Sequence, residues 1–267
     1  MILSCRSVEL GIACYGRERL VVTTEDAVLD LDLRQQRASV AVPLCGCSRN
    51  PLVLEDGTVY FARRHGVGCL RDAEISTAGG GFGGSLCLLR SPDDSVWVFD
   101  DGAPPAGASI TKLGEHLGQQ TRREIDYPAG NAPGALWLSA DDLLVIGQVG
   151  FRVFSLSTGA QRAHPVSQSN PRGLIHLGEG VVLTSGDSVS LVRTDISTWD
   201  RGEVAQLAVP SEIEPVSELS QDPDGTIYLA SHYRAPDPDW AFAVVRLRFP
   251  AGSFSRPQMT CHPAQQR

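Results

Sequence analysis

Two segments near the C-terminal end carry the side chains best suited to acid–base chemistry. Glu214 lies just before one predicted strand, and His232 follows the next predicted strand, residues 226–231. If these strands are antiparallel neighbours, both segments lie at the same edge of the sheet, with the carboxylate and the imidazole within hydrogen-bonding reach. Such a pair raises the pKa of the histidine and orients its ring. We therefore expect Glu214 and His232 to be catalytic, the alternative being a surface ion pair between Glu214 and Arg234.

The strands that position these residues belong to a unit that recurs along the chain. Each copy has an apolar strand, a short acidic or glycine turn and a second strand rich in β-branched and aromatic residues. A weak first copy begins at Val8, and five clear copies begin at Pro51, Ser85, Ala135, Gly173 and Val216. The predicted turn residues of the clear copies are Gly57, Asp94, Asp142, Gly180 and Gly225. Because these turns recur every 37 to 48 residues, each copy is typical of one four-stranded propeller blade.

The repeat predicts an all-β fold. We expect residues 1–267 to form a single six-bladed β-propeller with four-stranded antiparallel blades, the alternative being a sandwich or two smaller β domains. Two segments could supply the outermost strand of the last blade, residues 254–260 or the N-terminal Ile2–Cys5.

In a propeller, the loops that enter the innermost strands and the loops that leave the second strands lie at one mouth of the central channel. The residues of these loops are the site candidates. His65, in a loop after a second strand, is a further acid–base candidate beside Glu214 and His232. The substrate-binding candidates are Tyr233, Arg172, Arg64, Arg49, Phe82 and Gln148. The pair Asp100-Asp101, followed by a glycine, is interpreted as a solvated turn.

The blade repeat resembles those of known propeller families. Residues 94–159, with the run SVWVFDD and the later ITKLGE, resemble virginiamycin B lyase and NHL-type propellers. An asparagine just before an inner strand, in Asn50-Pro51, Asn131-Ala132-Pro133 and Asn170-Pro171, is similar to gluconolactonase/regucalcin and strictosidine-synthase-like propellers. The resemblance covers most of the chain but lies in the blade repeat, so it implies the fold and names no specific activity.

The resemblance also implies a metal site. Gluconolactonase-like propellers hold a divalent cation at the channel mouth through one glutamate, two asparagine-type ligands and an aspartate. The matching oxygen ligands for calcium or magnesium are Asn131, Asn170, Asp187 and Glu214. The family's early Glu-Gly-Pro motif is missing, since Glu9 is followed by Leu10 and Gly11. Without a metal, His232, His65 or Glu214 would perform acid–base chemistry with no cofactor.

The charge, the apolar segments and the cysteines of the chain bear on its binding partners and its location. The net charge of −8 and the pI of about 5.2 argue against nucleic acid and anionic membranes. The N-terminus lacks the apolar run of a secretion signal, and no segment is apolar enough for a membrane helix, so a cytoplasmic protein is expected. Seven cysteines without a paired-spacing framework are expected to be reduced. The oligomeric state is not indicated.

Two function classes fit these observations. The favoured one is a small-molecule enzyme, a lyase, hydrolase or ring-forming catalyst of biosynthetic type, with its substrate in the propeller mouth. The alternative is a non-catalytic propeller that serves as a protein-interaction scaffold. A polar channel with converging histidine and carboxylate groups favours the enzyme, whereas a plugged channel favours the scaffold.

Overall fold

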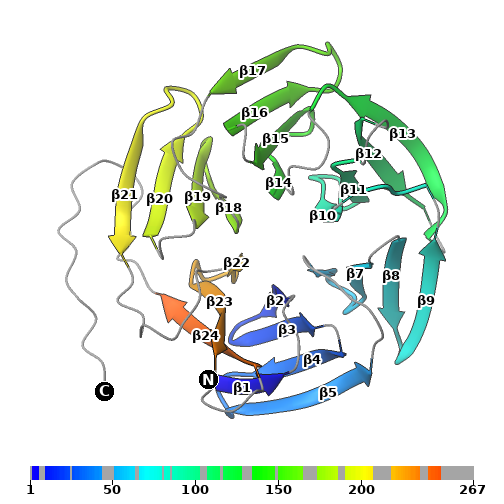
Figure 1. The fold of residues 1–267 in the computed structure, drawn as a ribbon, viewed down its shortest axis with the longest axis vertical. Helices are drawn as coiled ribbons and strands as arrows, with labels where there is room; N and C mark the ends of the chain where they lie inside the picture. The colour runs from blue at the N-terminus through cyan, green and yellow to red at the C-terminus, as the bar shows by residue number, and fades with distance from the viewer. Residues whose placement is uncertain are drawn as a thin grey trace.

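Six four-stranded antiparallel sheets surround a common axis (Figure 1). The computed structural model describes residues 2–5, 10–24, 26–43, 51–63, 66–79, 81–84, 86–102, 107–114, 117–127, 134–147, 150–164, 173–185, 190–206, 218–234 and 240–247. The predicted six-bladed β-propeller is therefore confirmed. The described residues contain no helix long and apolar enough to cross a membrane.

The strands of each blade follow one another outward from the axis. Blade 1 contains β2 (Leu10–Gly16), β3 (Arg19–Thr24), β4 (Ala27–Asp32) and β5 (Arg37–Pro43). Blade 2 contains β6 (Leu52–Val53), β7 (Val59–Arg63), β8 (Gly66–Arg71) and β9 (Glu74–Gly79). Blade 3 contains β10 (Leu86–Arg90), β11 (Val96–Asp100), β12 (Ala108–Leu113) and β13 (Gln119–Ile125).

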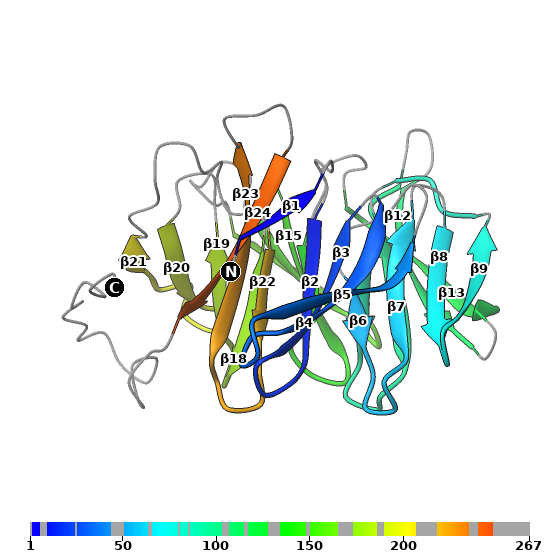
Figure 2. The same ribbon diagram turned by 90° about the horizontal axis from the view of Figure 1, so that it is seen from below.

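The second half of the ring repeats this order. Blade 4 contains β14 (Gly134–Trp137), β15 (Asp142–Gly147), β16 (Gly150–Ser155) and β17 (Gln161–His164). Blade 5 contains β18 (Leu174–Gly178), β19 (Val181–Ser185), β20 (Ser190–Asp195) and β21 (Arg201–Gln206). Blade 6 contains β22 (Glu218–Gln221), β23 (Ile227–Arg234), β24 (Trp240–Leu247) and β1 (Ile2–Cys5). Seen from the side, the strand ends lie on two opposite faces of the ring (Figure 2).

The N-terminal strand closes the ring. β1 pairs antiparallel with β24, with Ile2 opposite Ala243 and Cys5 opposite Trp240. Strands from the two ends of the sequence thus complete one blade, and the N-terminus lies beside β24 in Figure 1. Of the two predicted closures, the one through Ile2–Cys5 is confirmed, and residues 254–260 lie outside the described residues.

Aliphatic and aromatic side chains between neighbouring blades form the core. Phe99, Ile110 and Leu143 are fully buried where blade 3 meets blade 4. Leu20 and Tyr228 are fully buried where blade 1 meets blade 6. Each blade therefore covers the apolar face of the next, which a single four-stranded sheet cannot do alone.

The hairpin turns match the sequence prediction in four of the five clear copies. Gly57, Asp94, Gly180 and Gly225 have positive φ angles between 62° and 83°, as tight turns of this kind require. Asp142 does not, and it begins β15 instead. The turn there falls earlier because Ser139 Oγ accepts hydrogen bonds from the backbone N–H groups of Asp141 and Asp142.

The turn between β8 and β9 is strained at one position. Asp72 and Ala73 both have positive φ angles, 51° and 62°. An L-residue with a side chain pays about 1 kcal/mol or more in this region, although aspartate tolerates it better than alanine. We expect Ala73→Gly to raise the free energy of unfolding by about 0.5–1 kcal/mol in urea denaturation. The control Ala41→Gly, in the interior of β5, should lower it, and a loss of stability in both variants would contradict the assignment.

Candidate functional site

The topology brings the start of β22 and the C-terminal end of β23 to one end of blade 6. Both lie at the same edge of the sheet, because Glu218 pairs with Ala230 and Gln221 with Ile227. Nine predicted site residues lie outside the described residues, and their roles stay predictions: Arg49, Arg64, His65, Asn131, Gln148, Asn170, Arg172, Asp187 and Glu214.

His232 and Tyr233 lie in a strand and not in the loop after it. β23 continues to Arg234, and the backbones of His232 and Tyr233 pair with Phe242 and Ala241 of β24. The predicted strand end at Ser231 was wrong because the strand continues over three further residues, and β24 is long enough to pair with them. His232 therefore has an extended backbone near the end of β23, and its catalytic role stays a prediction.

A buried carboxylate holds the segment that enters blade 3. Asp100 Oδ2 accepts a hydrogen bond of 2.9 Å from the Gly83 N–H, and its Oδ1 accepts bonds of 2.9 and 3.0 Å from the N–H groups of Gly84 and Gly102. Asp100 and Asp101 are each 1% exposed. The prediction of a solvated turn here was wrong, because both residues are buried and the Asp100 carboxylate binds the backbone of a neighbouring segment.

Glycine is required where this segment approaches the aspartates. A Cβ atom on Gly84 would lie 2.0 Å from Asp101 Oδ1 and 2.4 Å from the carbonyl oxygen of Gly102. Phe82, on the same segment, is 8% exposed and packs in the core between blades 2 and 3, near Leu86 and Val98. The segment is thus fixed both by its backbone and by Phe82, whose contact with a substrate stays a prediction.

Two ionisable residues in the innermost strands were missed by the sequence analysis. Glu218 begins β22. Burial of the Cys87 thiol in β10 is the main cause of its raised pKa, and the negative charge of Glu218 raises that pKa further. Blades 6 and 3 are opposite each other in the ring, so the Glu218 charge acts across the central axis (Figure 1). The sequence signal was weak, because β22 has the sequence ELSQ and Glu218 is one of several polar residues in it.

The second missed residue is His176 in β18. Its Nε2 atom is buried and has no hydrogen-bond partner among the described residues. Burial lowers the pKa of His176, so the imidazole is neutral at pH 7 and can act as a base. Glu218 and His176 thus add one carboxylate and one imidazole to the inner ring of strands.

The described cysteines do not supply a nucleophile. Cys14, Cys69 and Cys87 are free thiols, as predicted. Burial raises the pKa of Cys14 and Cys87 to about 12 and also raises the pKa of Cys69, so all three are protonated near neutral pH. Among the described residues no group of three or more His, Cys, Asp or Glu side chains could hold a metal ion, and the predicted calcium or magnesium ligands lie outside them.

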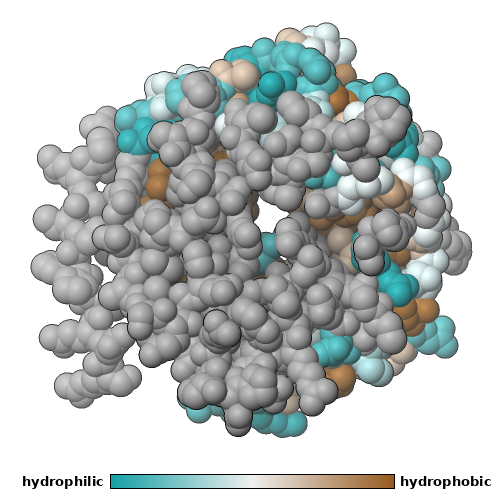
Figure 3. Space-filling model, viewed as in Figure 1, coloured by the Kyte–Doolittle hydropathy of each residue, from teal (hydrophilic) through white to brown (hydrophobic). Residues whose placement is uncertain are grey.

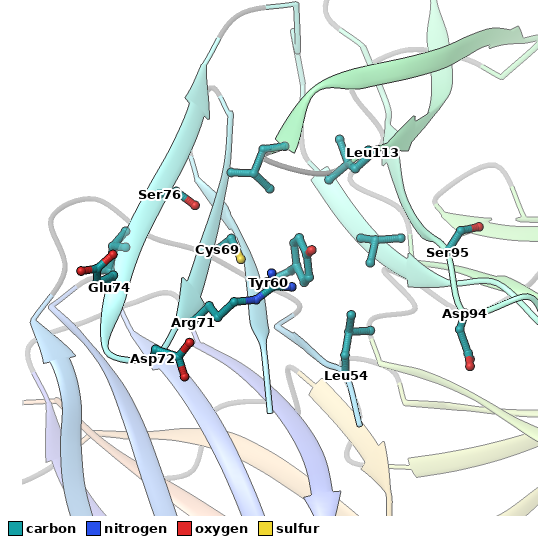
Figure 4. A pocket seen from close by; sticks show the side chains of 14 residues that line it. Leu54, Tyr60, Cys69, Arg71, Asp72, Glu74, Ser76, Asp94, Ser95 and Leu113 are labelled. Carbon is teal, nitrogen blue, oxygen red and sulfur yellow. The ribbon is translucent and has the colours of Figure 1, made fainter. Parts of the chain in front are cut away.

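A separate groove lies between blades 2 and 3 (Figure 4). We call it the inter-blade groove; its volume is about 760 Å³. Its lining residues are Leu54, Tyr60, Cys69, Arg71, Asp72, Glu74, Ile75, Ser76, Asp94, Ser95, Val96, Leu113, Gly114 and Leu117. Tyr60, Cys69 and Ser76 are cross-strand neighbours, and side-chain hydrogen bonds join Cys69 to both of the others.

Comparison with solved structures identifies the class of fold. No family model and no curated protein matches the sequence. A Bacteroides thetaiotaomicron protein of unknown function is 14% identical with a TM-score of 0.68, over 90% of this chain and 70% of that chain. A gluconolactonase from Xanthomonas campestris is 14% identical with a TM-score of 0.66, over 92% and 89%. The WD40 β-propeller domain of Doa1 is 10% identical with a TM-score of 0.59, over 94% and 96%.

These likenesses establish the fold alone. The chain has the six-bladed propeller fold that gluconolactonases also have, as the resemblance in the blade repeat implied. A β-propeller also occurs in the WD40 domain of Doa1, so the activity has to be argued from the site.

Proposed function

We propose that this protein is a small-molecule hydrolase that opens the ring of a lactone or a related cyclic ester at the mouth of its central channel. The observation that carries the proposal is the open centre of the ring, which is visible through the space-filling view in Figure 3. An open channel lined by converging strands is a usual place for a small ligand in a closed β architecture. The likeness to a gluconolactonase over 92% of the chain supports the choice of substrate class.

The proposed chemistry is attack of water on the ester carbonyl. Glu214 or His232 takes a proton from the attacking water, and the conjugate acid returns a proton to the leaving alkoxide, so the ring opens to a hydroxy acid. His65 is the third candidate for this role. A calcium or magnesium ion held by Asn131, Asn170, Asp187 and Glu214 would polarise the carbonyl oxygen when bound.

Substrate positioning falls to the remaining loop residues. We propose that the arginines and polar groups of the mouth bind the hydroxyl and carbonyl oxygens of the substrate: Arg49, Arg64, Arg172, Gln148 and Tyr233, with Phe82 beneath. A biosynthetic role and a cytoplasmic location stay proposals of the same kind.

The test is hydrolysis of a panel of lactones followed by pH-stat titration. Gluconolactone, γ-butyrolactone and δ-valerolactone should include at least one substrate whose ring opening exceeds the rate with heat-denatured protein. Rates equal to that blank for every lactone, from a folded sample, would overturn the proposed substrate class.

Metal removal has its own expected outcome. If Asn131, Asn170 and Glu214 bind calcium or magnesium, chelator treatment should lower the melting temperature, and added metal should restore it in a concentration-dependent way. The gain amounts to about 2.7 kcal/mol when the free metal is at one hundred times its Kd. A melting temperature that is the same with chelator and with millimolar calcium or magnesium would exclude the metal and leave the acid–base route.

A further inference from the structure

We propose that the free edge of β5, the outermost strand of blade 1, pairs with the same strand of a second copy of this chain. β5 pairs with β4 on one side, and no described strand lies on its other side (Figure 1). The outward backbone N–H and C=O groups of such an edge can continue the sheet with another strand. The edge lies on the rim of the ring, so this inference is independent of the proposed activity.

The side chains of β5 leave this edge accessible. The first five residues of the strand, Arg37–Ala41, are all exposed, and Val40 exposes 62% of its surface. Between Arg37 and Pro43 the strand has only Ala, Ser and Val residues, so it lacks the charges that normally keep edge strands apart. Covering Val40 removes apolar surface from water, which favours association.

The other outermost strands are better protected against pairing. β13, β17 and β21 each have at least one charged residue inside the strand, and β1 has only four residues. β9 begins with Glu74, beside Asp72 in the β8–β9 turn. Both residues have the sign of the net charge of the protein, −8, so two β9 edges would repel each other. The edge of β5 is therefore the least protected of the six.

A second copy is the partner that fits the charge pattern of β5. At a net charge of −8, two copies repel each other over most of their surface. The only charged residue of β5 is Arg37, which is positive and lies at the start of the strand. In a two-fold antiparallel pair centred on Ser39, Arg37 lies opposite Ala41 of the second copy, and Ala38 lies opposite Val40. No like charges are opposed in this register, and both Val40 side chains lie inside the contact.

Sedimentation equilibrium of the intact protein tests the pairing. A bulge at Ala41 shortens the regular edge to Arg37–Val40, so we expect a weak dimer with a Kd on the order of 10⁻⁵–10⁻⁴ M. Raising NaCl from about 50 to 300 mM should tighten the dimer, because salt screens the repulsion between the two copies. A protein that stays monomeric up to about 1 mM, or a dimer that salt dissociates, would overturn the proposal.

Two matched variants locate the contact. Val40→Lys places a charge on the β5 edge and should raise the Kd of the dimer at least about tenfold. The control Ile75→Lys adds the same charge on β9, where Ile75 is 38% exposed, and should change the Kd by less than about twofold. Equal effects of the two variants, or a loss only in Ile75→Lys, would exclude pairing through β5. Both side chains are exposed, so we expect both variants to fold, and an unchanged melting temperature checks this.

Discussion

Replacing Asp100 by alanine should lower the free energy of unfolding by about 3–5 kcal/mol. The carboxylate is 1% exposed and accepts three backbone hydrogen bonds, from Gly83, Gly84 and Gly102. Its removal leaves the buried Gly102 N–H and the partly buried N–H groups of Gly83 and Gly84 without this acceptor, and it opens a cavity where blade 3 begins. Urea denaturation followed by tryptophan fluorescence measures the loss.

Two further variants decide whether the hydrogen bonds cause this loss. Asp100→Asn keeps one acceptor oxygen and should lose less stability than Asp100→Ala. Asp224, which forms an exposed ion pair with Arg17 at 3.0 Å, is the control, and Asp224→Ala should cost no more than about 1 kcal/mol. A loss for Asp100→Ala as small as for Asp224→Ala would contradict the anchoring role.

Replacing Glu214 by glutamine, and separately His232 by alanine, should each reduce lactone turnover by about 10²-fold or more. Each variant removes a group that is proposed to transfer a proton in the transition state, and proton-transfer groups contribute about this much to the rate. Steady-state kinetics on the best lactone of the panel measures kcat and KM. Glu179→Gln, in the exposed β18–β19 turn, is the matched control and should keep wild-type turnover.

The kinetic constants of the two variants distinguish a role in proton transfer from a role in substrate binding. A loss in kcat with little change in KM supports proton transfer, whereas a rise in KM alone means substrate binding. Wild-type turnover in both folded variants would exclude the pair and direct attention to His176 and Glu218 in the inner strands.

The propeller could be predicted from the sequence because its turns are encoded locally. Glycines at 57, 180 and 225 tolerate positive φ angles, so each of these hairpins can be predicted from about ten consecutive residues. The sequence could not decide which segment completes the last blade. β1 pairs with β24, which is more than 230 residues away, and no local pattern links the two strands. The turn before Asp142 was misplaced because Ser139 caps the backbone and moves the turn toward the N-terminus.

The site was less predictable because its features depend on contacts between distant segments. Asp100 has the sequence context of a solvated turn, and its burial follows from the close approach of Gly83 and Gly84, more than fifteen residues away. His232 was assigned to a loop because the length of its partner strand β24 is not visible in the local sequence. The inter-blade groove combines two blades and follows from their packing alone.

The most direct test of the proposed function is a crystal structure with the hydroxy acid produced from the best lactone substrate. We expect the product at the channel mouth of the ring, with an oxygen atom within hydrogen-bonding distance of Glu214 or His232. Product bound only on the opposite face or only in the inter-blade groove, in crystals of active protein, would contradict a catalytic site at the mouth.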